Sequence, residues 1–430
     1  MIGEFRYRRG ELHCEGVKVK EIGESVGTPV YIYSYKAIVK KYAELNKAFA
    51  SLSPLICFSV KANSNLSICR VLTKEGAGLE IVSGGELYRA KRIRAHPKKI
   101  IFTGVGKREE EIREAVEYGV LLIYAESEQE LELLEKVAKE KRKRIKVGLR
   151  INPDVLAGGH KYIQTGKKES KFGLPLKRVK KIFMQRKQSP YIELCALHFH
   201  LGSYITTPQP FVDTLKRVIP LVKELEEMGI GIGYLDIGGG FYQPAEEFAK
   251  AIIPLLKGFS ARLILEPGRF LIVESGMLLS KVLYTKTQGK KRFIVVDAGM
   301  NDFIRPALYN ASHQILSLHK SRGEHSKVNI VGPVCESGDF FAQGIEFPLI
   351  ERGEYLAIMN TGAYGFTMSS NYNSRPRPAE VLVKEDRFYL IREREGYKDL
   401  VRGEKVWSRA GTEDRSILCG IGSQERRCAE

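Results

Sequence analysis

The chain has 430 residues, 43% hydrophobic and 28% charged, which allows a sizeable core and excludes a disordered chain. The net charge of +18 admits nucleic-acid binding, but Lys and Arg alternate with Glu in segments such as 126–144, which favours a solvated surface and no nucleic-acid partner. No apolar run reaches the roughly 18 residues of a membrane span, no signal peptide is evident, and seven cysteines without a CxxC pair favour reduced thiols in the cytoplasm.

The first 35 residues alternate between apolar and polar side chains and contain no long helical pattern, so we expect them to join a β domain. From about residue 53 to 269, apolar runs alternate with amphipathic helical patterns, as in parallel α/β folds. Eight such runs predict a (β/α)8 TIM barrel over residues 36–270. A doubly wound open sheet is the alternative, but no GxGxxG opens a helix after the first strand. The predicted strands are 55–62, 79–84, 100–106, 121–127, 145–153, 194–203, 234–240 and 263–269.

The pattern changes after residue 270. Short apolar or alternating runs follow one another without long helices, which predicts an antiparallel β domain over 271–403 together with 1–35. Residues 404–430 are rich in Arg, Glu, Gly and Ser and predict a weakly ordered tail.

Chemistry in a TIM barrel collects at the carboxyl ends of the strands, and two charged residues stand at such ends. Lys61 follows the apolar run LICFSV. Burial would lower its pKa and make its amine nucleophilic, although a lysine that reaches the surface is the alternative. Glu266 ends the eighth strand. It either pairs with Arg269 as a buried ion pair or faces the ring nitrogen of a cofactor and keeps it protonated.

The ends of the sixth and seventh strands also carry polar or permissive residues. Gly238–Gly240 would let the backbone approach a phosphate or would simply form a tight turn, and Ser203 could donate to the same phosphate. His198 and His200 point to one face of their strand. No third metal ligand has suitable spacing, so we expect no metal. His200 suits stacking on a flat cofactor, and His198 suits a hydrogen-bonded core position.

Six motifs, FSVKAN, HFHLGS, DIGGG, EPGR, VCESGD and GAYG, occur in this order. Together they resemble the fold-type III pyridoxal-phosphate decarboxylases over roughly residues 5–400. The strings at 160–173, 296–310 and 371–381 are most similar to the diaminopimelate decarboxylases of that family. The resemblance implies an α/β barrel followed by a β domain, pyridoxal 5'-phosphate as cofactor, and a homodimer with shared active sites. The implied reaction converts meso-2,6-diaminopimelate to L-lysine and CO2, the last step of lysine biosynthesis.

The same resemblance implies a role for each matching residue. Lys61 resembles the Schiff-base lysine, His200 the ring-stacking histidine and Glu266 the partner of the pyridine nitrogen. Cys335 is similar to the cysteine that returns a proton to the substrate, and it reaches the partner subunit's site with Glu336. The implied cofactor-binding set is Lys61, His200, Ser203, Gly238, Gly239, Gly240, Glu266, Pro267, Gly268, Arg269 and Tyr364. The implied substrate-binding set is Arg269, Arg305, Tyr309, Glu336 and Tyr364.

Two departures from the family pattern bear on the pocket. Tyr204 stands where the family usually has Gln, and the segment between DIGGG and EPGR is short. A decarboxylase for ornithine, lysine or a carboxy-polyamine is the nearest rival, but those substrates lack the distal carboxylate that Arg269 and Arg305 would bind. An alanine racemase would pair the ring nitrogen with arginine instead of Glu266. A non-enzymatic pyridoxal-phosphate carrier would need only Lys61 and the phosphate site and would lack the second domain with Cys335 and Glu336.

Overall fold

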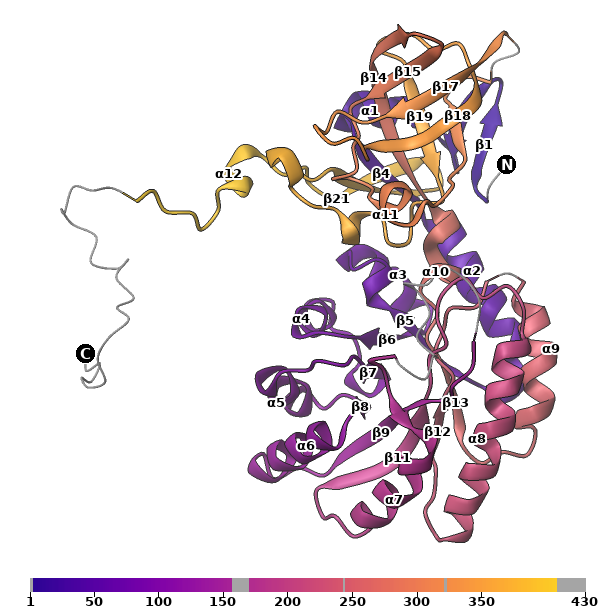
Figure 1. The fold of residues 1–430 in the computed structure, drawn as a ribbon, viewed down its shortest axis with the longest axis vertical. Coiled ribbons are helices and arrows are strands. Elements are labelled where there is room, and N and C mark those ends of the chain that lie inside the picture. Colours follow the sequence, from indigo (N-terminus) through magenta and orange to yellow (C-terminus); the bar gives the residue numbers. More distant parts are fainter. Residues whose placement is uncertain (1–2, 157–169, 243, 321–322, 408–430) are drawn as a thin grey trace.

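The computed structural model describes residues 3–156, 170–242, 244–320 and 323–407. Two units are stacked along the long axis of the molecule, a parallel barrel below and a sheet domain above it in the view of Figure 1. Within the described ranges, no helix combines the length and apolar character needed to cross a membrane.

The lower unit is a closed barrel of parallel strands, which confirms the predicted fold class and excludes the open sheet. The strands follow one another around the barrel, and pairing of β8 with β9 completes the circle. They are β5 (Leu55–Ser59), β6 (Gly78–Ile81), β7 (Ile100–Phe102), β8 (Leu122–Ala125), β9 (Ile145–Asn152), β11 (Ile192–His198), β12 (Tyr234–Asp236) and β13 (Arg262–Leu265), with the short β10 (Leu174–Pro175) beside β9. Each predicted strand range overlaps one of them, although β6, β11 and β13 begin one or two residues earlier than predicted.

Helices surround the barrel, and their sequences explain where they begin. Ser34, Asn65, Ser83 and Ser127 each accept a hydrogen bond from a backbone N–H of the first turn that follows, as N-cap residues do. The helices are α2 (Tyr35–Ala48), α3 (Leu66–Lys74), α4 (Gly84–Arg92), α5 (Glu109–Tyr118), α6 (Glu128–Glu140), α7 (Leu176–Arg186), α8 (Gln209–Glu227), α9 (Ala245–Leu256) and the short α10 (Arg269–Ile272).

Charged side chains on α5 and α6 are paired with one another. On α5 and α6, Arg113 contacts Glu109 and Glu140, and Lys136 lies 3.1 Å from Glu109. The apolar face of α6 is buried against the barrel, with Leu131, Leu134, Val137 and Ala138 in the core. The interleaved charges of this segment therefore form a solvated, paired surface, as the sequence predicts.

The upper unit is a mostly antiparallel sheet. Its strand order is β18-β17-β15-β14-β4-β20-β21, with β19 between β14 and β16. Only β15–β17 and β4–β20 run parallel in this sheet. The strands are β4 (Val30–Ser34), β14 (Gly276–Gln288), β15 (Lys291–Val296), β16 (Ile315–Ser317), β17 (His325–Val331), β18 (Phe340–Pro348), β19 (Tyr355–Met359), β20 (Ala379–Lys384) and β21 (Arg387–Arg392).

The N-terminal segment joins this upper unit, as expected. Strand β4 lies between β14 and β20 in the sheet. A small sheet of β1 (Phe5–Arg8), β2 (Glu11–Cys14) and β3 (Val17–Lys18) is tied to it, because the N–H of Leu12 donates to the carbonyl of Leu318. The remaining helices of the unit are α1 (Val19–Val26), α11 (Arg305–Tyr309) and α12 (Tyr397–Leu400).

One loop of the upper unit is anchored at the carboxyl end of a barrel strand. The N–H of Tyr364 donates to the carbonyl of Ala62 over 2.8 Å, and Asn63 donates to the carbonyl of Gly362 over 3.1 Å. The loop after β19 therefore lies directly above Lys61. We retain the predicted division, 36–270 for the barrel and 1–35 with 271–403 for the β domain, as a proposal. Most of the predicted tail, residues 408–430, lies outside the described residues.

Candidate active site

Lys61 lies immediately after β5, in a single 3-10 turn that begins at Val60. Its Nζ donates to both carboxylate oxygens of Glu80, over 2.9 and 3.0 Å. Burial lowers the pKa of Lys61, but the negative charges of Glu80 and Glu266 raise it by more, so its pKa lies above the ordinary value. The predicted depression of this pKa is therefore wrong, because neighbouring carboxylates outweigh desolvation.

Glu80 is a functional candidate that the sequence analysis missed. It is fully buried at the end of β6 and also accepts a hydrogen bond from the hydroxyl of Thr103. The signal was present in the sequence, since an acidic residue inside the apolar strand GLEI needs a cationic partner. That partner is Lys61, which follows β5, the strand that pairs with β6 in the barrel.

Glu266 is buried at the end of β13, with 2% of its surface exposed. Its Oε2 lies 3.4 Å from His198 Nε2 and 4.0 Å from His200 Nδ1, and its Oε1 has no hydrogen-bond donor. No ion pair joins Glu266 to Arg269 among the residues that the structure covers, so the simple ion-pair alternative does not hold. Burial raises the pKa of Glu266 more than the charges of Lys61 and Arg150 lower it. Oε1 lacks a donor apart from the neighbouring Asp236 carboxyl, so it can accept from a cationic or donating ring nitrogen.

Asp236 joins this buried group, although the sequence spacing did not reveal it. One ligand-type atom from each of His198, Asp236 and Glu266 lies within 4.8 Å of the other two. Burial and the charge of Glu266 raise the pKa of Asp236 well above its ordinary value. Two buried carboxylates this close cannot both ionise cheaply, and the pKa of each lies above its ordinary value.

His198 is buried, but neither ring nitrogen has a hydrogen-bond partner in the described structure. The prediction that His198 is buried is therefore confirmed. The prediction that its ring is hydrogen-bonded is wrong. Burial lowers the pKa of His198 well below its ordinary value, so the ring is neutral. It packs instead against the ring of Tyr124, with 4.8 Å between the centroids.

The glycines after β12 bring three strand ends into close contact. A Cβ on Gly239 would lie 2.0 Å from the carbonyl oxygen of Glu266, and one on Gly240 would lie 1.9 Å from that of Gly202. Gly238 and Gly240 also have positive φ angles of 69° and 88°, which disfavour any side chain. The N–H of Gly239 donates to His200 Nδ1 over 3.1 Å. The tight turn is thus real, and it fixes the His200 ring beside the group around Glu266.

Arg269, the first residue of α10, connects this turn to the upper unit. Its Nε donates to the hydroxyl of Ser203 over 3.3 Å, and its guanidinium lies 5.0 Å from the ring centroid of Tyr364. Pro267 and Gly268 precede it in the buried turn that follows β13. Burial lowers the pKa of Arg269, yet an arginine so far from its titration range stays charged.

Arg305 lies beside Arg269 although it comes from α11 of the upper unit. Its guanidinium lies 5.1 Å from the ring centroid of Tyr309 and 5.9 Å from that of Tyr364. Burial and the charge of Arg269 lower the pKa of Arg305 to about 10, and its Nε has no hydrogen-bond acceptor. Neither arginine forms an ion pair with a carboxylate within the described ranges.

A cavity of about 340 Å³ opens beside these two arginines. Its wall includes His313, which the sequence analysis did not single out. Burial first, and then the charges of Arg305 and Arg269, bring the pKa of His313 to about 4. His313 Nδ1 lies 2.9 Å from the carbonyl oxygen of Met359, so the neutral ring donates there and its Nε2 is an acceptor.

Tyr204, the departure from the family pattern, lines the same cavity together with Tyr242. The two rings have centroids 4.6 Å apart, and Tyr204 is 48% exposed with a φ of 66°. An aromatic pair therefore forms part of the cavity wall at the position where a glutamine is usual.

Cys335 and Glu336 are not brought to this site within the chain. Both are exposed in the loop between β17 and β18. The N–H of Cys335 donates to Asn373 over 2.8 Å, and the Glu336 carboxylate accepts from the hydroxyl of Tyr372 over 3.5 Å. Among the described residues, no hydrogen bond or ion pair joins either residue to Lys61, Glu266 or Arg269.

Comparison with known proteins places this geometry in a family. The model of the pyridoxal binding domain of pyridoxal-dependent decarboxylases matches residues 35–273. Diaminopimelate decarboxylase from Aquifex aeolicus is 43% identical over 92% of this chain and 96% of its own length. The enzyme of that name from Pseudomonas fluorescens is 44% identical over 94% and 99%. The chain belongs to the diaminopimelate decarboxylase family. Diaminopimelate decarboxylase from M. jannaschii, solved in complex with L-lysine, superposes on this decarboxylase with a TM-score of 0.90, at 36% identity over 94% of this chain and 99% of that one.

The residues of this decarboxylase fit the cofactor that the family model describes. The matched range contains Lys61, Ser203, Gly238–Gly240 and Glu266. Glu266 offers a buried oxygen that lacks a donor, and the glycine turn leaves no room for side chains between the strand ends. A phosphorylated pyridine with an aldehyde needs three kinds of group. An amine binds the aldehyde, a glycine-lined turn with a hydroxyl binds the phosphate, and a buried carboxylate faces the ring nitrogen.

Proposed function

We propose that this chain decarboxylates meso-2,6-diaminopimelate to L-lysine and CO2, the last step of lysine biosynthesis. The observation that carries the proposal is the pair of buried arginines, Arg269 and Arg305, which line one cavity and form no carboxylate ion pair among the described residues. Buried cations without a partner are costly. A substrate whose far end carries a carboxylate removes that cost through bidentate hydrogen bonds.

Pyridoxal 5'-phosphate is the proposed cofactor. Lys61 would hold it through its amine, and Gly238–Gly240 with Ser203 would bind its phosphate. Glu266 would face the ring nitrogen through Oε1, and His200, fixed by the N–H of Gly239, would stack on the ring. When bound, the cofactor supplies an electron sink for the carbanion that forms as CO2 leaves.

Other side chains would hold the released Lys61 amine, bind the distal end of the substrate and donate a proton. Glu80 would hold the Lys61 ammonium whenever that amine is released, because both carboxylate oxygens already accept from Nζ. Glu336 suits the distal ammonium of the substrate, and Tyr309 and Tyr364 would flank its distal carboxylate through their contacts with Arg305. Cys335 is proposed as the donor of the proton that replaces the departing carboxylate.

A homodimer with shared sites follows as part of the proposal. Cys335 and Glu336 are exposed and lie in the β domain, whereas Lys61 lies in the barrel. A partner subunit that brought its own Cys335 and Glu336 to the barrel would complete both sites. In a symmetric dimer with an isologous interface, each subunit would insert its loop between β17 and β18 into the site of the other.

The direct test is to incubate the pure protein with pyridoxal phosphate and meso-diaminopimelate and to measure L-lysine and CO2. Ornithine and L-lysine serve as matched substrates that lack the distal carboxylate. We expect kcat/KM for diaminopimelate to exceed both by roughly 10²-fold or more, since unpaired buried cations penalise the shorter substrates. Comparable values for ornithine and diaminopimelate would assign the chain to the rival decarboxylases.

A further inference from the structure

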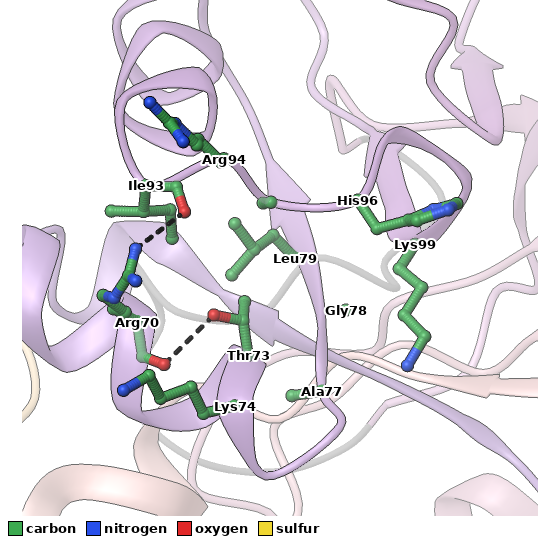
Figure 2. A pocket seen from close by; sticks show the side chains of 11 residues that line it. Arg70, Thr73, Lys74, Ala77, Gly78, Leu79, Ile93, Arg94, His96 and Lys99 are labelled. Atoms are coloured by element: carbon green, nitrogen blue, oxygen red, sulfur yellow. Dashed lines mark hydrogen bonds between the residues drawn. The ribbon is translucent and has the colours of Figure 1, made fainter.

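A second cavity, of about 400 Å³, lies at the opposite end of the barrel strands (Figure 2). It is formed where α3 ends, where β6 begins, and in the segment that leads from α4 to β7. Leu79 and Ile93 contribute buried apolar surface to its floor. Its volume is in the range of small-molecule sites.

The rim of this cavity carries only cationic or potentially cationic charged side chains. They are Arg70, Lys74, Arg94, His96 and Lys99. No aspartate or glutamate lines the cavity, and none of the five rim residues forms an ion pair anywhere in the described ranges. This differs from the neighbouring helix surface, where Arg113 pairs with two glutamates and Lys141 lies 3.0 Å from Glu117.

Two of the rim cations are held in place by backbone carbonyls. Arg70 Nη1 donates to the carbonyl of Ile93 over 3.3 Å, and Lys99 Nζ donates to that of Gly76 over 3.0 Å. Figure 2 shows Arg70 and Lys99 on opposite sides of Leu79, with Lys74 nearer to Arg70. Positive charge therefore surrounds an apolar floor, and part of it is positioned before any ligand arrives.

We propose that this cavity binds a small phosphorylated metabolite. A phosphate group carries up to two negative charges and several acceptor oxygens, which match several separate cations better than a single carboxylate does. The apolar floor formed by Leu79 and Ile93 suits the organic part of such a molecule. The site is distinct from the catalytic site and does not depend on the function proposed above, because it lies at the amino ends of the strands.

The test uses the complete chain saturated with pyridoxal phosphate, so that phosphate binding at the catalytic site is already satisfied. Isothermal titration calorimetry with inorganic pyrophosphate, and separately with inorganic phosphate, is run at constant ionic strength in chloride to hold general screening fixed. We expect one saturable pyrophosphate site per chain in this cavity.

The principal variant combines Lys74→Glu with Arg94→Asn. Arg94 has a φ of 54°, which asparagine tolerates well, so the loop should keep its shape. Each lost charge-assisted contact weakens binding about tenfold, so the dissociation constant for pyrophosphate should rise roughly 100-fold. Lys74→Gln alone, a milder change, should raise it about tenfold, and Lys216→Glu on the exposed face of α8 is the matched control that should leave it unchanged.

Three results would overturn the proposal. The first is the absence of saturable binding of either probe to the wild-type protein. The second is an unchanged dissociation constant in both cavity variants. The third is a loss of binding in Arg144→Glu with none in the cavity variants, which would place the anion in the adjacent cavity lined by Lys98, Lys143, Arg144 and Lys146. Equal melting temperatures and cofactor absorbance across the variants establish that the folds are intact.

Discussion

The barrel and the β domain hold their reactive side chains in opposite surroundings. In the barrel, Lys61, Glu80 and Glu266 lie at strand ends within 2.9 to 4.0 Å of charged or ionisable partners. In the β domain, Cys335 and Glu336 are exposed in a loop. The barrel thus assembles the proposed cofactor-binding groups within one chain, whereas the proposed proton donor is exposed on the β domain and makes no contact with them among the described residues.

Lys61→Ala should have the largest effect on turnover. Its amine is the proposed covalent attachment, so its loss should lower kcat by roughly 10³-fold or more. Borohydride treatment of the wild-type protein followed by peptide mapping should place the cofactor on Lys61. Lys91→Ala, which removes a surface partner of Glu114, is the control and should retain both label and turnover. A label on any other lysine would contradict the assignment.

Glu266→Gln tests whether the buried group at the end of β13 acts electrostatically. The amide keeps the shape but removes the negative charge that would hold the ring nitrogen protonated. We expect cofactor binding to persist and kcat to fall by about 10²-fold or more. Stopped-flow turnover with the absorbance of bound cofactor measures both, and near-normal turnover would exclude the electron-sink role.

Arg305→Ala tests the share of the β domain in substrate choice. The variant should lower kcat/KM for diaminopimelate by about 10²-fold and should change any residual turnover of L-lysine far less. Arg305 is a sharper probe than Arg269, which also contacts Ser203 near the glycine turn. Equal losses for both substrates would show that Arg305 does not recognise the distal carboxylate.

Mixing Lys61→Ala with Cys335→Ala protein tests the shared site directly. Each variant is expected to be inactive alone. Random exchange in an equal mixture makes half of the dimers heterodimers, each with one intact site, so roughly a quarter of wild-type activity should return. Native mass spectrometry must show that subunits exchange. If exchange is complete and no activity returns, Lys61 and Cys335 do not act together across two subunits, and the shared-site proposal fails.

Glu86→Gln should produce the smallest effect, on stability. Burial and the charge of Glu80 raise the pKa of Glu86 from 4.5 to about 7. The folded protein therefore binds this proton more tightly than the unfolded chain does. That stabilisation is complete below pH 4.5 and is lost as the pH rises through about 7. Glutamine mimics the protonated form.

The free energy of unfolding of Glu86→Gln, relative to wild type, should thus increase by roughly 1–3 kcal/mol between pH 5 and pH 8. Denaturant titrations at fixed protein and cofactor concentrations measure it. Glu114→Gln, at an exposed ion pair, should show no such trend. A flat difference for Glu86→Gln would mean that its carboxyl is not protonated in the folded protein.

Much of the architecture follows from the sequence alone. The barrel strands are largely apolar runs, most of whose residues are buried, and such runs are visible without knowledge of the fold. Because chemistry in this architecture collects where those runs end, Lys61, His200, Gly239 and Glu266 could be named from their positions. The resemblance in motif order then supplied Cys335 and Glu336, which no periodicity would have indicated.

The tertiary structure decided how those residues are charged and paired. Lys61 lies opposite Glu80, 19 positions further along the chain, and that pairing reverses the pKa shift expected from burial. His198, Asp236 and Glu266 meet because β11, β12 and β13 are neighbours in the barrel. Arg305 reaches Arg269 only because the β domain lies over the strand ends. Local sequence determines which segments are buried. The effect of one charge on the pKa of another group depends on the distance between them, and only the closed barrel with its covering domain sets those distances.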